Sequence, residues 1–272
     1  MLRRNLFIGL FISLVSLNGF AQTKCFILSE AGHTLKKEGN CEVRNPPCST
    51  FKIALSLMGY DVEILSNEEN PNWPFVEGYT DWLSQWKKNY TPKLWLKNSC
   101  VWYSQVLTKK LGIQKLSKYV SQFQYGNQDI SGDKGKNNGL TNCWLSSSLK
   151  ISALEQKTFL EGLLYSRLPV SQKSHKMTRN ILFIENLESE WKLYGKTGAG
   201  TFINSNGARD EGRKIGWFVG WIEKGNRKII FVQYSELVGD EIKKYTYGSV
   251  HAKKVAKEKL EEFIRHDASN QS

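Results

Sequence analysis

A serine and a lysine three positions apart, Ser49 and Lys52, have the residue types of a nucleophile and its base. If this segment is helical, positions i and i+3 share one face, so the amine can reach the hydroxyl. A serine hydroxyl becomes a good nucleophile only when a base removes its proton. A lysine can be that base only if burial or a neighbouring cation lowers its pKa. The apolar residues of segment 51–58 are expected to supply the burial.

The Ser-x-x-Lys spacing carries little weight alone. It recurs four more times in the chain, at Ser84, Ser131, Ser147 and Ser189. Ser49 differs from these because Pro46-Pro47 precede it, and proline favours the first turn of a helix. Backbone N–H groups at a helix start point outward, where they could stabilise an oxyanion.

Lys196-Thr197-Gly198 is the second candidate, at the end of a strand-like run. A lysine there can bind a carboxylate or lower the pKa of a neighbour, and glycine lets a ligand approach the backbone. In isolation the tripeptide is more typical of an ordinary strand end at the surface.

Together the two motifs match the Ser-x-x-Lys plus Lys-Thr-Gly signature of penicillin-recognising serine enzymes. The chain also contains, in matching order, Ser99-Cys100-Val101, Tyr125-Gly126-Asn127 and Trp144. From about Cys25 to the final helix it resembles the class D β-lactamases, or oxacillinases. Residues 125–129, 138–141 and 149–152 resemble the narrow-pocket subgroup of that family.

The middle motif separates related families. Class A enzymes carry Ser-Asp-Asn and transpeptidases usually Ser-x-Asn, whereas Val101 occupies the amide position here. An apolar side chain facing Lys52 would exclude water and lower the amine's pKa further.

The resemblance implies a mechanism in which Ser49, Lys52, Ser99 and Lys196 are catalytic. Lys52 would take up CO₂, supplied as bicarbonate, and the resulting carbamate (N6-carboxylysine) would act as general base. Trp144 would hydrogen-bond that carbamate through its indole N–H, and Ser99 would relay a proton to the departing lactam nitrogen. The resemblance implies no metal and no bound cofactor.

The same resemblance assigns the substrate contacts. The N–H groups of Ser49 and Ala199 would form the oxyanion hole, and Lys196 with Thr197 would orient the substrate carboxylate. The expected substrate-binding residues are Val101, Tyr125, Asn127, Thr197, Gly198 and Ser249.

One position departs from the family. Many class D enzymes have an arginine near the start of the last helix that holds the substrate carboxylate, and the motif alignment places Ala252 there. Ser249, Thr197 or His251 could replace it. The subgroup that this sequence resembles also lacks the arginine.

Two alternatives would acylate Ser49 without efficient turnover: a penicillin-sensing receptor domain and a D,D-peptidase. Sensors normally follow several membrane spans, whereas this chain has a single apolar segment. Val101 argues against a peptidase. We therefore expect hydrolysis of small-molecule β-lactams, namely penicillins and oxacillin-type compounds.

The elements that must position these residues follow from the hydrophobic period. Residues 25–28 predict a strand, and the prolines predict a helix that begins near Ser49 and ends at Gly59. Further helices are expected at 101–111, 114–123, 152–165 and 250–266. Strands are expected at 191–197, 216–223 and 228–235, with Gly225-Asn226 as a hairpin turn.

These elements predict an α+β fold, an antiparallel sheet flanked by helices plus an all-helical sub-domain. The resemblance implies that this fold is of the β-lactamase/transpeptidase type. We expect a discontinuous α/β sub-domain over 22–60 and 171–272. The helical sub-domain is expected over 61–170.

Residues 1–21 have the composition of a signal peptide: Arg3-Arg4, an apolar stretch over 6–17, then Gly19-Phe20-Ala21. The apolar run is short for a membrane span of ~20 residues, which favours cleavage over an uncleaved anchor. We therefore expect a periplasmic protein without stable membrane association after cleavage.

The formal net charge of +12 raises the possibility of a polyanionic partner. The basic residues form pairs rather than blocks, and aromatic residues are not interleaved with them. We therefore expect a solvated basic surface and no nucleic acid as partner. We also expect a monomer or a weak homodimer.

The five cysteines contain no C-x-x-C pair, so they predict neither a metal site nor a thioredoxin-like motif. An oxidising compartment permits a disulfide, and Cys41–Cys48 would close the shortest loop. The odd number leaves at least one thiol free or paired between chains.

Overall fold

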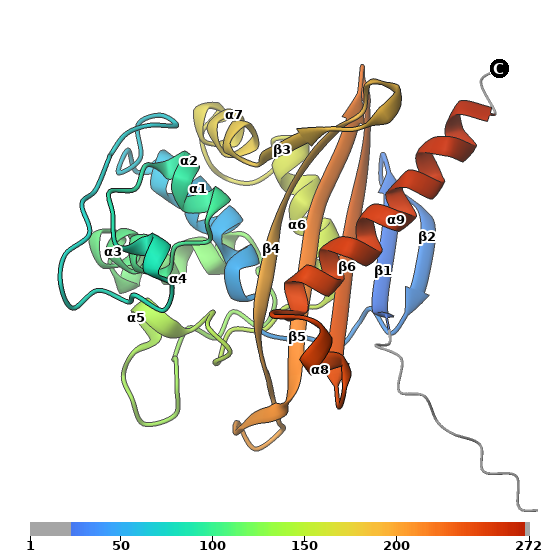
Figure 1. The fold of residues 1–272 in the computed structure, drawn as a ribbon. Helices are drawn as coiled ribbons and strands as arrows, with labels where there is room; N and C mark the ends of the chain where they lie inside the picture. The colour runs from blue at the N-terminus through green and yellow to red at the C-terminus, as the bar shows by residue number, and fades with distance from the viewer. Residues whose placement is uncertain (1–22, 270–272) are drawn as a thin grey trace, which may run out of the picture.

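The computed structural model describes residues 23–269, in which a six-stranded antiparallel sheet has helices on both faces (Figure 1). Its strand order is β2-β1-β6-β5-β4-β3. The strands are β1 Thr23–Glu30, β2 His33–Gly39, β3 Phe183–Asn186, β4 Lys192–Ile203, β5 Arg209–Lys224 and β6 Arg227–Val238. The predicted antiparallel sheet with flanking helices is therefore present. The predicted signal peptide lies outside the described residues.

Both faces of the sheet are covered, which explains why the middle parts of β5 and β6 are buried at consecutive positions. Phe26 and Phe218 pack under α9, Gly248–Ser269, which crosses one face. Ile27 and Trp217, their chain neighbours, belong to the core on the other face. This is the alternation of a β-strand, applied to a sheet with two covered faces.

The helices other than α9 lie mostly on the opposite side (Figure 1). They are η1 Cys48–Phe51, α1 Lys52–Asp61, η2 Ser84–Trp86, α2 Pro92–Lys97, α3 Val101–Leu111, α4 Ile113–Gln122, α5 Gly139–Asn142, α6 Ala153–Leu164, α7 Gln172–Ile181, η3 Glu188–Glu190 and α8 Glu241–Lys244. Within residues 23–269, no helix combines the length and apolar character needed to cross a membrane.

Several sequence predictions need correction. Gly59 does not end the central helix, which continues to Asp61. A side chain at Gly59 would collide with Leu65. Glycine at this position therefore allows α1 to pack closely against Leu65 and does not end the helix. Residues 62–91 contain only the short helix η2 and are not mainly helical. Lys196-Thr197-Gly198 lies within β4 rather than at a strand end.

Several described elements were not predicted, namely β2, β3, α2, α5, α7, α8 and the short helices η2 and η3. β2 and α7 are polar, and β2 is exposed along most of its length, so neither has the apolar repeat that marks a buried element. α2 has six residues, too few for that repeat to show.

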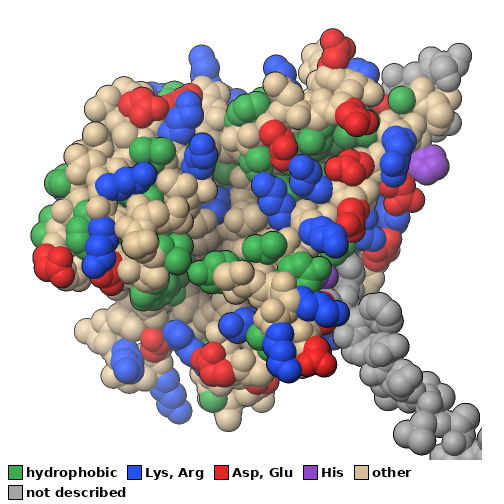
Figure 2. Space-filling model, viewed as in Figure 1, with side chains coloured by type: hydrophobic (Ala, Val, Ile, Leu, Met, Phe, Trp, Pro, Cys, Tyr) green, Lys and Arg blue, Asp and Glu red, His purple; other side chains and the backbone are tan. Residues whose placement is uncertain are grey.

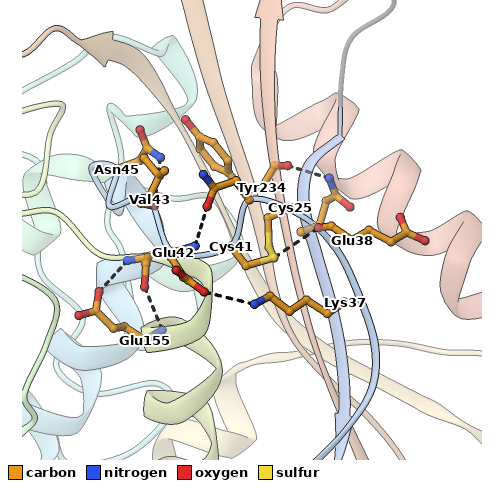
Figure 3. Close-up of a disulfide and its surroundings, with 12 residues drawn as sticks. Cys25, Lys37, Glu38, Cys41, Glu42, Val43, Asn45, Glu155 and Tyr234 are labelled. Atoms are coloured by element: carbon orange, nitrogen blue, oxygen red, sulfur yellow. Dashed lines mark hydrogen bonds and ion pairs between the residues drawn. A yellow bond between two sulfur atoms is a disulfide. The ribbon is translucent and has the colours of Figure 1, made fainter.

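A disulfide joins Cys25 of β1 to Cys41, which follows β2 (Figure 3). The shortest loop, Cys41–Cys48, is therefore not the one that closes. The hairpin pairing of β1 with β2 brings Cys25 beside the end of β2, whereas Cys48 is buried and free near Ser146. The disulfide therefore attaches the start of segment 41–47, which leads to η1, to the sheet.

Candidate active site

Ser49 and Lys52 meet as the spacing predicted: the Nζ of Lys52 donates to the Oγ of Ser49 over 3.0 Å. Ser49 lies in η1 and Lys52 begins α1, so one continuous turn carries both. Thr50 fastens this turn, since its N–H and its hydroxyl both donate to the carbonyl oxygen of Pro47, over 3.1 and 2.7 Å.

Lys52 has no exposed surface. Burial lowers its pKa from 10.5 to about 8, because a charged ammonium loses its hydration there. Ser49, by contrast, is only half-buried, so a ligand can reach its hydroxyl. The pair therefore combines an accessible hydroxyl with an amine that gives up its proton readily.

A second serine–lysine pair comes from distant parts of the chain. The Nζ of Lys196, on β4, donates to the Oγ of Ser99 and to the carbonyl oxygen of Thr197. Ser99 occupies the turn between α2 and α3 with a φ of 54°. Burial, followed by the positive charges of Lys52 and Lys253, holds the pKa of Lys196 well below its usual value.

Val101 begins α3 and is almost fully buried, in the core that contains Phe51 and Trp144. Cys100 before it and Cys48 are free and buried, and burial raises the pKa of both thiols, to about 12 and about 11. At neutral pH these groups are uncharged, so they bring no anion to compensate an ammonium on Lys52.

The outer edge of β4 carries backbone N–H groups toward the site. β3 pairs only with Lys192, Leu193 and Tyr194, which leaves the rest of that edge without a neighbouring strand. The N–H of Gly195 donates outward to Leu182, and that of Thr201 donates to the Oγ of Ser146. Because strand N–H directions alternate, the N–H groups of Thr197 and Ala199 point to the same edge.

Gly198 allows β4 to approach the nucleophile turn. A Cβ at this position would lie 2.7 Å from the carbonyl oxygen of Pro47 and 3.1 Å from the side chain of Thr50. The strand and η1 therefore touch through backbone atoms, which brings the neighbouring Ala199 to the side of Ser49.

Trp144 is fully buried, and its ring lies 5.7 Å from that of Phe51, the residue before Lys52. Its Nε1 is buried and has no hydrogen-bond partner among the described residues. A buried donor without a partner is costly and rare in native proteins. An acceptor that joins this site would satisfy it.

Tyr125 and Asn127, both predicted to bind substrate, contact other residues of the protein in this structure. Tyr125 has no exposed surface and packs edge-on to Phe51, with ring centroids 5.1 Å apart. Asn127 donates to the carbonyl oxygen of Ser148 over 2.8 Å and accepts from the N–H of Lys150 over 2.9 Å. Tyr125 therefore packs against the nucleophile turn, and Asn127 joins its own loop to residues 148–150.

The candidates for holding a carboxylate differ in position. Ala252 is fully buried under the sheet, and His251 is buried with its ring against Tyr245. Ser249 is half-buried and follows Gly248. Gly248 lies against Gly216, the register partner of Ala199.

Sequence reasoning missed Lys253, which lines a cavity beside Lys196 and Thr197. The only sequence feature that could have pointed to Lys253 is its position next to Ala252, which aligns with the arginine of many class D enzymes.

The chain is similar to known proteins over most of its length. The family model of the penicillin binding protein transpeptidase domain matches residues 28–261. The chain is 41% identical over 225 residues to β-lactamase OXA-9 of Klebsiella pneumoniae, covering 82% of each protein. It is 40% identical over 237 residues to β-lactamase OXA-1 of Escherichia coli, covering 85% of this chain and 82% of that protein. The crystal structure of the class D β-lactamase OXA-427 matches with a TM-score of 0.83 at 40% identity, covering 89% of this chain and 98% of that one.

Proposed function

The chain belongs to the class D β-lactamases, and from this we propose that it hydrolyses penicillins and oxacillin-type β-lactams through an acyl-enzyme on Ser49. The observation that carries the proposal is the 3.0 Å contact between the Ser49 hydroxyl and a fully buried Lys52 amine.

In acylation, the Oγ of Ser49 attacks the lactam carbonyl carbon while its proton leaves toward Lys52. The N–H groups of Ser49 and Ala199 are suited to hold the oxyanion that forms. When the C–N bond breaks, Ser99 donates a proton to the lactam nitrogen, and Lys196 orients the Ser99 hydroxyl. Water then hydrolyses the ester and regenerates Ser49.

Lys52 is proposed to work in its carbamylated form. The structure fits such a group in two ways: Lys52 is buried with a lowered pKa, and the partnerless Nε1 of Trp144 is available as a donor. An uncharged amine adds CO₂ and releases one proton, and the carbamate supplies a base for acylation and for activating water. Because Lys52 has no exposed surface, bulk water does not reach this side chain.

The relatives support hydrolysis rather than the alternatives, since OXA-9, OXA-1 and OXA-427 are all named β-lactamases. Neither a penicillin sensor nor a D,D-peptidase is needed to explain the site. Val101, in place of an amide, agrees with this choice.

We also propose that the protein is exported to the periplasm. The composition of residues 1–21 supports a cleaved signal peptide. The Cys25–Cys41 bridge adds support, because disulfides persist in oxidising compartments.

The test is turnover of the chromogenic cephalosporin nitrocefin and acylation by a labelled penicillin, using the mature chain. Ser49→Ala should abolish both. Ser84→Ala is the matched control, since Ser84 has the same spacing to a lysine but lies in η2, outside the site. Retained labelling in Ser49→Ala, or no turnover by the wild type, would overturn the proposal.

A further inference from the structure

A cavity of about 510 Å³ lies at the outer edge of β4, where β3 no longer covers it. Lys196 and Thr197 form one wall, the end of α2 with Lys97 forms another, and Lys253 of α9 closes a third. The cavity shares Lys196 with the candidate active site, and its lining contains lysines but no aspartate or glutamate. Such a space suits an anionic group.

The strand register places Thr197 and Lys253 on one face of the sheet. Thr197 pairs with Phe218 of β5, and cross-strand partners point to the same side. Phe218 packs under α9, and the Nζ of Lys253 lies 5.9 Å from the centre of its ring. Directly opposed side chains stand about 5 Å apart, so the Thr197 hydroxyl and the Lys253 ammonium border the same space.

Lys253 differs from the other lysines of α9. Lys254 lies near Glu258, Lys257 pairs with Glu185 and Lys259 pairs with Glu38. Lys253 has no acidic partner within residues 23–269 and is only half-buried. Figure 2 shows Lys and Arg side chains on the face that contains α9 and the hollow beside the sheet. An ammonium without an acidic partner at the wall of a cavity is able to pair with an anionic ligand.

We propose that Lys253 is the cation that, together with Thr197, binds the carboxylate of the β-lactam. The inference rests on the proposed function and deepens it, because it names the residue that performs the task of the absent arginine. Ala252, at the aligned position, is buried in the core, whereas the next residue of the helix faces the cavity. A helix presents adjacent residues about 100° apart, so a shift of one position redirects the side chain to the open edge of β4.

The experiment compares a chromogenic cephalosporin with its methyl ester, which lacks the negative charge. In the wild type, kcat/KM should favour the free acid. Lys253→Met retains the aliphatic cover over Phe218 but removes the charge. It should lower the acid-to-ester preference about tenfold, mainly through KM, because a charge-assisted contact is lost. Lys253→Arg should restore most of the preference.

Lys254→Met is the matched control, since it removes the same charge one residue away and on the exposed surface. Its acid-to-ester preference should equal that of the wild type. An unchanged preference in Lys253→Met, or an equal decrease in Lys254→Met, would overturn the inference while leaving β-lactam hydrolysis intact. A wild type that hydrolyses neither compound would refute the proposed function and this inference with it.

Discussion

Gly198 of β4 lies against Pro47 so closely that a single added carbon would approach the Pro47 carbonyl oxygen to 2.7 Å. This contact joins the strand that carries Lys196, Thr197 and Ala199 to the turn that carries Ser49. The absence of a side chain at Gly198 therefore sets the distance between β4 and the turn that carries Ser49.

Gly198→Ala should separate the strand from the nucleophile turn. The methyl group would force the backbones apart, and a displacement approaching 1 Å can cost about 100-fold in rate. We expect kcat/KM for nitrocefin to fall by about that factor. Gly212→Ala is the control, because its added carbon would meet only the side-chain oxygen of Asp210, at 3.3 Å. Equal activity of the two variants would contradict the account.

Activity should depend on bicarbonate most strongly at low pH. Only the uncharged amine of Lys52 adds CO₂, and with a pKa of about 8 the uncharged fraction is about a tenth at pH 7 and smaller below it. We expect turnover in CO₂-depleted buffer to fall as pH decreases below about 8, and added bicarbonate to restore it. Initial rates across pH, with and without bicarbonate, provide the measurement. A rate indifferent to bicarbonate at mildly acidic pH would count against carbamylation.

Trp144→Phe should weaken the carbamate without destabilising the fold much. The ring packing on Phe51 is largely kept, and the removed Nε1 donor has no partner to lose. A buried hydrogen bond to a charged group contributes about 1.5–3 kcal/mol, so the bicarbonate needed for half-maximal activity should rise by at least about tenfold.

Trp95→Phe is the control for Trp144→Phe, because it should lower the thermal stability without changing the bicarbonate requirement. The Nε1 of Trp95 donates to the Oγ of Ser104 over 2.8 Å, so its loss should lower the melting temperature. The bicarbonate requirement should stay at the wild-type level. If both tryptophan variants changed that requirement equally, Trp144 would have no special role.

The Cys25–Cys41 bridge should contribute to stability rather than to chemistry. It closes a loop with a sequence separation of 16, and a loop of this size corresponds to about 3 kcal/mol of unfolding free energy in the chain-entropy description. We expect Cys25→Ser with Cys41→Ser to lose about this much in urea unfolding and to keep its kcat for nitrocefin. Reducing agent should lower the stability of the wild type to the same level but leave the double variant unchanged.

The sequence determined those features that depend on neighbours along the chain. Ser49 and Lys52 share one turn, so their spacing alone predicted their contact, and the apolar residues around Lys52 predicted its burial. The helix over Val101–Leu111 and the hairpin at Gly225 were likewise predictable from local pattern and turn residues. The family was recognisable because its motifs keep their residue types and order.

Only the tertiary structure decided the features that join distant segments. The contact of Ser99 with Lys196 depends on how β4 passes the turn after α2, which no periodicity encodes. The pairing of Cys25 with Cys41 depends on the β1–β2 hairpin, which the polar sequence of β2 did not reveal. The direction of Lys253 depends on the rotation of α9 over the sheet. Packing of one element on another sets that angle, and the composition of the helix leaves it open.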